Sequence, residues 1–256
     1  MNSEESIKNH NRKELKDFFR DGEIPSQNHF HSLIDSTINK HDDGISKNED
    51  EGLVIKSFAD KASFISFYKN VDDLDPYFLI EKDELKPESL VLRPVTKTKN
   101  NERESFFFNT AGNLGLGKKS NNKYRLDVNG FTGAVGRIGT FRQGKAEANG
   151  KWQTIIPALD SCQAFEIVAR AGFKKNKRFA MLHAIAVSAF GKSRNRVRAT
   201  SAYYGSFWSK LRIRWKSNSM NNYELQIKTN CKYRDDDKIF YTIGKLWDDD
   251  LFLHEV

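Results

Sequence analysis

The sequence has few of the features that mark membrane, disulfide-rich or metal-dependent proteins. No apolar run approaches the ~20 residues of a membrane-spanning helix, so membrane insertion is not expected. The only two cysteines, Cys162 and Cys231, form neither a disulfide framework nor a metal signature. Because each lies in an alternating apolar segment, we expect buried free thiols. A bridge between them stays open, since both lie in the same half of the chain.

The first residues do not resemble a signal peptide either. The first 16 residues, MNSEESIKNHNRKELK, are polar and mixed in charge, without the apolar stretch of a secretion signal. We therefore expect synthesis in the cytoplasm without a signal peptide. If the chain acts outside a cell, something other than a signal sequence must carry it there.

Motifs of common enzyme and cofactor sites are absent too. The glycine-rich residues 112–117 have the wrong spacing for a phosphate loop and lack its strand and helix. His29 and His31 are two residues apart on an expected helix, so they point to different sides and cannot share a metal. His183 stands alone in an apolar segment and is interpreted as a core or edge histidine. With no nucleophile elbow either, we expect no catalytic residue, no metal and no cofactor.

Clustered carboxylates are the remaining candidates for chemistry. The triplets 235–237 and 248–250 are all aspartate, and such clusters can bind Ca²⁺. They lack EF-hand spacing, so solvated turns are the better interpretation, and Ca²⁺ binding stays open. No periodic element places two carboxylates for glycoside hydrolysis, which disfavours an enzyme. A polysaccharide-degrading enzyme that uses loop carboxylates such as Asp160 or Asp248 is kept as an alternative.

Charge and tryptophan are distributed unevenly along the 256 residues. Residues 1–130 hold 20 basic and 23 acidic side chains, whereas residues 131–256 hold 22 and 11, and the whole chain carries +8. The second half also holds all four tryptophans: Trp152, Trp208, Trp215 and Trp247. Such asymmetry indicates different roles for the two halves, with the basic half facing an anionic partner.

Residues 1–45 are expected to form a short helical segment. Apolar residues at helical spacing occur on both sides of residues 21–25, DGEIP, where Gly22 can end one helix and Ser26 can start the next. Such a pair cannot bury a core alone, so its apolar faces must pack on something else. We interpret it as a docking segment, with a helical decoration on the chain's own β-domain as the alternative. The predicted docking residues are Leu15, Phe18, Phe19, Phe30, Leu33 and Ile34.

The rest of the chain is expected to be mainly β. Residues 41–51 are acidic and poor in apolar residues, as in a linker. Residues 52–130 contain short apolar runs between turn formers, which predicts a β-rich shaft or collar module. Residues 131–256 show clearer alternation and predict a β-sandwich-like, jelly-roll-like domain. Within it, residues 182–190 are expected to form a buried strand, and residues 210–231 a hairpin with one apolar and one largely basic face.

The strongest local signal is the mixture of basic and aromatic residues between positions 192 and 216. Three interpretations compete: a solvated sheet face, a site for an anionic glycan or cell surface, and a nucleic-acid site. The last is disfavoured, because no zinc finger or RNP box is present. The predicted ligand-binding residues are Tyr203, Tyr204, Trp208, Arg194, Arg196, Arg198, Lys210, Arg212, Arg214 and Lys216.

Several segments resemble one family of proteins. The N-terminal residues 15–26 (LKDFFRDGEIPS) are similar to the opening of tail-fibre-like proteins encoded with phage-derived contractile injection systems. Residues 113–117 (NLGLG) followed by 126–130 (LDVNG) resemble a junction common in phage tail fibres. Four segments resemble the adhesin-type end domain of such fibres: 150–152 (GKW), 159–172 (LDSCQAFEIVARAG), 202–208 (AYYGSFW) and 246–249 (LWDD).

The resemblance implies a homotrimer that attaches to the baseplate or another tail component through its N-terminus. It implies target recognition by the C-terminal domain, and a place in a phage-tail-like particle. The single junction implies a short fibre or compact component, and the chain ends without a self-cleaving chaperone, so no autoproteolysis is expected. An internal adaptor of the particle that never meets a target cell is a further alternative.

Overall fold

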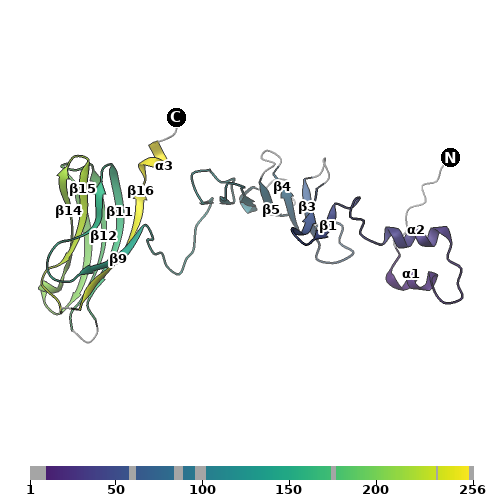
Figure 1. The fold of residues 1–256 in the computed structure, drawn as a ribbon, viewed down its shortest axis with the longest axis horizontal. Helices are drawn as coiled ribbons and strands as arrows, with labels where there is room; N and C mark the ends of the chain where they lie inside the picture. The colour runs from purple at the N-terminus through teal and green to yellow at the C-terminus, as the bar shows by residue number, and fades with distance from the viewer. Residues whose placement is uncertain are drawn as a thin grey trace. The chain divides into compact units, whose positions relative to one another are not determined.

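The computed structural model describes residues 10–57, 62–83, 89–95, 102–173, 177–234 and 236–253. Two compact units divide the chain, Met1–Thr132 and Gly133–Val256, two residues from the boundary expected between 130 and 131. Several sheets and a few short helices make up these units (Figure 1), so the expected mainly β fold class is confirmed.

Two short helices open the described chain, α1 (Arg12–Phe18) and α2 (Gln27–Asp35). The Asn11 side chain caps α1 by accepting from the amides of Lys13 and Glu14, and the Glu14 carboxylate accepts from the Asn11 amide. Ser26 precedes α2 as expected. The helices meet through rings: Phe18 stacks on His29 at 4.2 Å between centroids.

Residues 41–51 are not only a linker. A hairpin of β1 (Ile45–Asn48) and β2 (Gly52–Ile55) begins within them, and its register pairs Ile45 with Ile55. In the turn, the Asn48 side chain accepts from the Glu51 amide at 2.6 Å. The linker prediction was wrong here because backbone pairing and turn hydrogen bonds form a hairpin without many apolar side chains.

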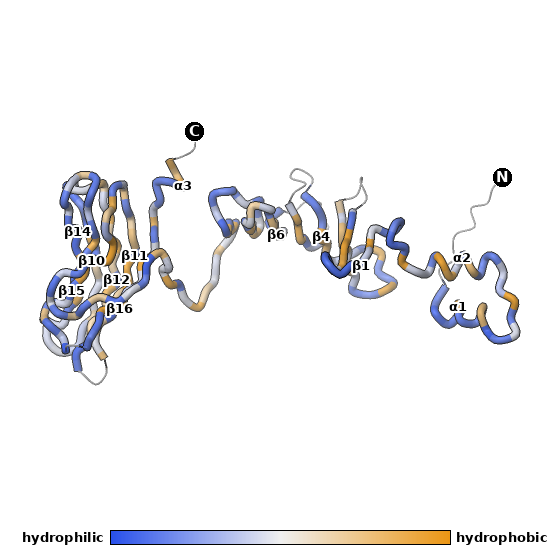
Figure 2. Tube along the Cα trace, viewed as in Figure 1, coloured by the Kyte–Doolittle hydropathy of each residue, from blue (hydrophilic) through white to orange (hydrophobic). Residues whose placement is uncertain are grey.

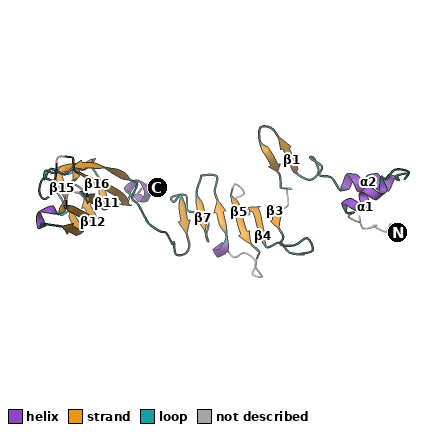
Figure 3. Cartoon of the chain, turned by 90° about the horizontal axis from the view of Figure 1, so that it is seen from below, coloured by secondary structure: helices purple, strands orange, loops and turns teal. Residues whose placement is uncertain are grey.

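A six-stranded sheet follows, with its strands neighbouring one another in chain order (Figure 3). All pairs are antiparallel except the last, β7 with β8, which is parallel. Strand β7 was not expected from the sequence. A Cβ on Gly115 would lie 2.1 Å from the Lys118 carbonyl oxygen, so close backbone approach requires glycine there. A 3-10 turn, η1 (Glu102–Glu104), precedes β6. The strands are β3 (Ser63–Phe67), β4 (Phe78–Lys82), β5 (Leu90–Pro94), β6 (Phe106–Phe108), β7 (Leu114–Leu116) and β8 (Leu126–Val128).

The second unit is a sandwich of two antiparallel sheets (Figure 1). The first sheet has the order β13-β12-β11-β16-β9, and the second has the order β10-β15-β14. A 3-10 turn, η3 (Phe207–Ser209), lies between β13 and β14, and α3 (Asp249–Leu253) follows the last strand. The strands are β9 (Arg142–Glu147), β10 (Gln153–Leu159), β11 (Cys162–Ala171), β12 (Phe179–Ala189), β13 (Arg196–Tyr204), β14 (Leu211–Ser219), β15 (Asn222–Thr229) and β16 (Lys238–Trp247).

The hydrophobic core lies between these two sheets. Phe165 and Ile167 of β11 pack in one cluster with Leu225 and Ile227 of β15, and Figure 2 shows the apolar segments along β11 and β12. The expected hairpin is present, with Ile213 paired to Ile227. In β11 and β12 every second residue is buried, so hydrophobic burial of one face specifies the register of these strands.

Two predictions about buried residues were wrong. Strand β12 is not buried on both faces: Leu182 is buried, whereas Ile185 on the outer face is exposed. His183 also lies on the outer face, with its Nε2 2.9 Å from Glu166 Oε1, so it is neither a core nor an isolated histidine. The second sheet covers only one side of β12. The sequence of β12 is a continuous apolar run, so it does not indicate that one face is exposed. Both cysteines are free thiols, but they are half-buried rather than buried.

Candidate functional site

An open groove lies where the two sheets of the sandwich meet at one edge. Strand β13 is the edge of the first sheet and β14 is the edge of the second, and η3 carries the chain from one to the other. The groove has a volume of 460 Å³. Its lining residues are Trp152, Leu182, Val197, Ala199, Ser201, Phe207, Lys210, Leu211, Arg212, Ile213 and Arg214.

The floor of the groove is apolar, and the side chains that line its β13 wall are short. Leu182 and Leu211 are buried at the base. From β13, alternation turns Val197, Ala199 and Ser201 towards the groove, and these short side chains leave space. The groove is therefore a wide apolar trough, with its polar groups concentrated on the β14 side.

Lys210 forms the first cationic element of the rim. Its Nζ lies 4.8 Å from the Tyr203 ring centroid and 4.7 Å from that of Phe207, within cation–π range of both. Phe207 and Trp208 lie edge to face at 6.1 Å, and Tyr203, Phe207 and Trp208 are all exposed. The ammonium group is thus held among aromatic faces that remain open to a ligand.

Trp152 organises the other end of the rim. The guanidinium of Arg214 lies 4.2 Å from its ring centroid, and the Lys228 ammonium lies 4.8 Å from it. Arg214 Nε also donates to Gln226 Oε1 at 2.9 Å. Arg212, which lines the groove between Lys210 and Arg214, has no side-chain partner among the residues that the structure describes. One oriented and one unpaired guanidinium therefore flank the trough.

Lys216 belongs to a self-contained polar cluster further along β14. Its Nζ lies 3.0 Å from Glu224 Oε1, and Thr154 Oγ1 donates to Glu224 Oε2 at 2.9 Å. Burial alone would raise the pKa of Glu224, but hydrogen bonds from Lys216 and Thr154 and the Lys216 charge lower it below its ordinary value. Lys216 is thus neutralised internally and adds little to the groove.

The predicted ligand-binding residues do not form one patch. Because side chains alternate along β13, Arg196 and Arg198 lie on the outer face of the first sheet, next to Val187 and Ile185 of β12. Tyr204 is on that face as well, edge to face with Phe179 at 5.9 Å. Arg194 precedes the strand. The structure therefore brings together Lys210, Arg212, Arg214 and Tyr203, places Trp208 beside them in η3, and separates the other five.

Sequence reasoning did not assign three residues of the site. Phe207 lay among the aromatic residues of the basic stretch, but Trp152 and Lys228 enter from β10's start and from β15, more than ten residues away along the chain. Pairing of β14 with β15 brings Lys228 opposite Arg212. Only the sheet register reveals these neighbours, because no local motif connects them. Trp215, in contrast, packs inward at 6.2 Å from Phe165 and donates its indole N–H to the Arg196 carbonyl oxygen at 3.2 Å.

The turn η3 is held from beneath by a buried tyrosine. The Tyr233 hydroxyl donates to the carbonyl oxygen of Ser209, which is itself buried. Above the turn, Ser206 Oγ accepts from the Trp208 amide at 3.3 Å. Gly205, at φ +88°, adopts the left-handed conformation that lets β13 enter the turn. These contacts fix the positions of Phe207 and Trp208 at the mouth of the groove.

Burial raises the pKa of Tyr233 to about 12, although its hydrogen bond to Ser209 acts in the opposite direction. An unfolded tyrosine ionises near pH ~10, so the folded state holds its proton longer. The contribution of protonated Tyr233 to the free energy of unfolding is fully present below pH ~10. It is lost as the pH rises towards the pKa of the folded state, at up to ~1.4 kcal/mol per pH unit. We expect Tyr233→Phe to cost about 1 kcal/mol at pH 8 through the lost hydrogen bond.

Urea unfolding of both proteins between pH 8 and pH 11.5 measures this effect. The difference in free energy of unfolding between the wild type and Tyr233→Phe should shrink above pH 10. An advantage that stays constant across the range would contradict the assignment of Tyr233 as a buried anchor.

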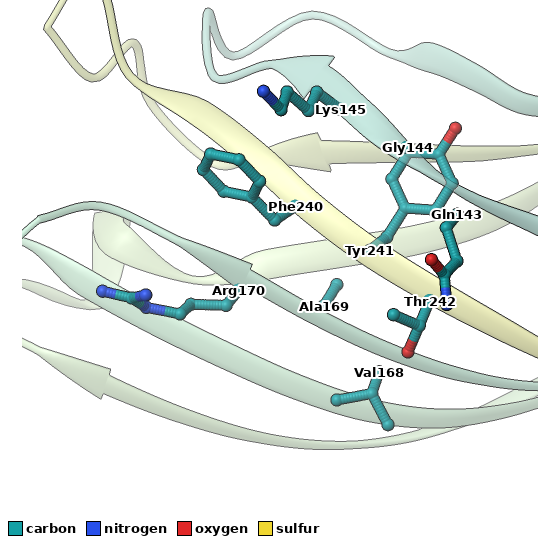
Figure 4. Close-up of a pocket in the computed structure, with 9 residues that line it drawn as sticks. All are labelled: Gln143, Gly144, Lys145, Val168, Ala169, Arg170, Phe240, Tyr241 and Thr242. Atoms are coloured by element: carbon teal, nitrogen blue, oxygen red, sulfur yellow. The ribbon is translucent and has the colours of Figure 1, made fainter. Parts of the chain in front are cut away.

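A second hollow, of 490 Å³, lies over β9, β16 and β11, at the opposite edge of the first sheet (Figure 4). Phe240 is one of its lining residues, with Lys145 Nζ 5.4 Å from the Phe240 ring centroid. The Phe173 ring meets Phe240 edge to face at 6.1 Å, and the Arg170 guanidinium lies 6.0 Å from the Phe173 ring. This hollow repeats the combination of cation and ring, but with two cations rather than three lining it.

No protein-family model matches this chain, and a comparison with curated proteins gives no significant match. The likeness to tail-fibre-like proteins therefore stays a prediction. None of the helices in the described ranges has the length and hydropathy of a membrane-spanning segment. The same ranges contain no group of three or more His, Cys, Asp or Glu side chains placed to bind a metal, and Asp235 of the first triplet lies outside them.

Proposed function

We propose that this chain is a structural, fibre-like component of a phage-derived contractile injection particle, and that it binds an anionic glycan on a target-cell surface. The binding site is the edge groove between β13 and β14. The observation that carries the proposal is the pairing of aromatic rings with cations along one open trough, at the exposed Phe207 with Lys210 and at the half-buried Trp152 with Arg214.

The chemistry of this rim fits an acidic sugar polymer. Flat aromatic faces can pack against the apolar faces of sugar rings, and guanidinium groups bind carboxylate or sulfate in a planar, bidentate manner. The unpaired Arg212 is available for such a group. A trough that is open along two edge strands admits an extended polymer, whereas an enclosed pocket would admit only a small molecule. Each site would bind weakly, and several copies would raise the avidity.

The helical pair would supply attachment to the particle. Of the predicted docking residues, Leu15 is buried and Phe19 packs against Phe30 at 5.4 Å within the pair. Leu33 and Ile34 of α2 are exposed. An exposed apolar stripe on a short helix suits docking into a groove of another tail component.

A binding assay with matched variants tests the groove. Heparin-derived oligosaccharides serve as the anionic probe, and neutral dextran as the uncharged one. We expect Arg212→Glu with Arg214→Glu to weaken heparin binding at least tenfold, because both charges flank the trough. Arg196→Glu with Arg198→Glu is the matched control: it makes the same change of charge on the outer face of the neighbouring strand, and should weaken binding less than threefold.

The outcomes separate the alternatives. Equal losses in the two double variants would show diffuse charge attraction and contradict a built site. Tighter binding of a single-stranded oligonucleotide than of heparin would favour nucleic acid, and release of shorter oligosaccharides would favour an enzyme. Circular dichroism checks the folding of each variant, and Phe207→Ala against Tyr204→Ala repeats the comparison with aromatic residues on the two faces.

The adaptor alternative is tested in the particle. Deleting the chain should leave assembled particles that no longer attach to target cells. Failure of assembly would show an internal adaptor instead.

A further inference from the structure

The hollow over β9, β16 and β11 has the size and the neighbours of a ligand site. The register between β16 and β11 places Phe240 opposite Arg170 and Thr242 opposite Val168, so these four side chains share the outer face of the first sheet. Strand β9 borders the hollow on the far side of β16. Its volume of 490 Å³ lies within the range of about 300–1,000 Å³ that is usual for pockets of small molecules.

Two cations border this hollow without a carboxylate partner in the part of the chain that the structure describes. Lys145 Nζ lies 5.4 Å from the Phe240 ring centroid. Arg170 donates to the Gly172 carbonyl oxygen at 3.3 Å, and its guanidinium lies 6.0 Å from the Phe173 ring centroid. Because a guanidinium has several N–H donors, most of those of Arg170 remain available to a ligand. Figure 4 shows the Lys145 and Arg170 side chains extending in the same direction, with the Phe240 ring between them.

The acidic side chains of the three strands are already paired with other cations. Strands β9 and β11 have one each, Glu147 and Glu166, and β16 has none. Glu147 Oε1 accepts from Lys238 Nζ at 2.5 Å, whereas Glu166 contacts Arg137 at 2.6 Å and His183 at 2.9 Å. Neither carboxylate neutralises the two cations of the hollow. The hollow therefore has a positive rim that an anion would complement.

The other lining residues indicate which kind of anion fits. Phe240 and Val168 give the hollow an apolar floor, and the alkyl stem of Lys145 adds to it. The hydroxyl groups of a sugar need acceptors as well as donors, but no carboxylate lines the hollow. A ligand with an apolar body and one acidic group needs only an apolar surface and cationic donors. The lining thus favours an amphiphilic acid over a carbohydrate.

We propose that this hollow binds a free acyl or aryl carboxylate, whose apolar body lies on Phe240 and whose acidic group is bound by Lys145 and Arg170. Glu147 and Glu166 lie two residues along their strands from lining residues of the hollow and would repel the anionic surface of a membrane. A single small acid does not meet this repulsion. The inference is independent of the glycan proposed for the groove at the opposite edge of the sheet.

Calorimetric titration of the full-length chain with octanoate tests the site. Octanoate should bind about tenfold more tightly than octanol, which lacks the charge, and than acetate, which lacks the chain. Lys145→Met with Arg170→Met keeps the apolar stems and removes both charges, so it should weaken octanoate binding about tenfold. Arg196→Met with Arg198→Met is the matched control on the same outer face, two strands away from β11, and should keep the wild-type affinity.

Two further variants separate this site from the groove and from a folding defect. Val168→Phe fills the hollow without changing a charge and should abolish octanoate binding, while circular dichroism checks that each variant is folded. Arg212→Glu with Arg214→Glu should weaken heparin binding but keep octanoate binding, so the two proposals can fail separately.

Three results would overturn the proposal. One is octanoate binding that is no tighter than that of octanol or acetate. Another is an equal loss of affinity in the matched control and in the variant without the two rim charges. The third is binding to phosphatidylglycerol vesicles that the same rim variant weakens, because the ligand would then be a membrane surface rather than a free acid.

Discussion

Replacing Phe165 by alanine should lower the free energy of unfolding of the second unit by about 3–5 kcal/mol. Phe165 is 0% exposed and lies at the centre of the sandwich. Its ring packs at 5.4 Å on Phe141 and at 6.2 Å on Trp215, which comes from the other sheet. Truncation removes the contacts on both sides and leaves a cavity that the two sheets cannot fully close.

Thermal and urea unfolding, followed by tryptophan fluorescence, measure the loss, because all four tryptophans lie in this unit. Val135→Ala is the control in the same unit, since Val135 is 112% exposed, and the change there should stay within about 0.5 kcal/mol. A cost below 1 kcal/mol for Phe165→Ala would mean that the sheets do not pack around this ring.

Gly139→Ala should destabilise the second unit by about 1–3 kcal/mol and release the segment that leads into it. A Cβ at this position would lie 2.3 Å from the Gly244 amide nitrogen and 2.4 Å from the Ile243 carbonyl carbon, both in β16. Backbone atoms cannot move aside as a flexible side chain can. The incoming segment must therefore detach from β16, with loss of the bridge between Thr140 and Ile243.

Hydrogen exchange of residues 137–141, together with the unfolding midpoint, measures this effect. Gly136→Ala is the control in the same segment, because no atom lies within 4 Å of a Cβ built there, and it should change neither quantity. The ion pair between Arg137 and Glu166, at 2.6 Å, should be lost only in the Gly139 variant. Slow exchange that persists in Gly139→Ala would refute the close backbone contact as the cause of attachment.

The core and the groove are coupled through Trp215. Its ring packs against Phe165, and its indole N–H binds the Arg196 carbonyl oxygen of β13. This hydrogen bond joins β14 to β13, which are the two walls of the groove. A repacked core would shift Trp215 and so change the width of the groove, even though neither residue lines it. If a core variant such as Phe165→Ala binds the ligand less well, its stability must be measured as well before the loss is assigned to the groove.

Alternation in the sequence was sufficient to predict the hairpin at 210–231, whereas the β-rich module at 52–130 was predicted from short apolar runs between turn formers. Alternation was sufficient because one-sided burial imposes a period of two on a strand, and Ile213 and Ile227 follow that period. It failed for β7, whose three residues are too short to show a period, and for β12, whose small and apolar exposed residues conceal its outer face.

The candidate site was predictable only in part. A basic and aromatic stretch at 192–216 was evident, but its members alternate between faces of β13 and β14. Lys210, Arg212 and Arg214 reach the groove, whereas Arg196 and Arg198 do not. The sequence shows how many charged residues lie close together along the chain. Which of these residues share a surface is determined by the pairing of their strands with neighbouring strands.

By itself, the sequence determined that this protein is mainly β, that its second half is basic and rich in tryptophan, and that its N-terminal residues form two short helices. Those properties follow from composition and local periodicity, which act over a few residues. Tertiary structure alone decided that Trp152 meets Arg214, that η3 rests on Tyr233, and that Lys145 and Arg170 border one hollow. These are contacts between distant segments, and they depend on sheet order and register, which local residue patterns leave undetermined.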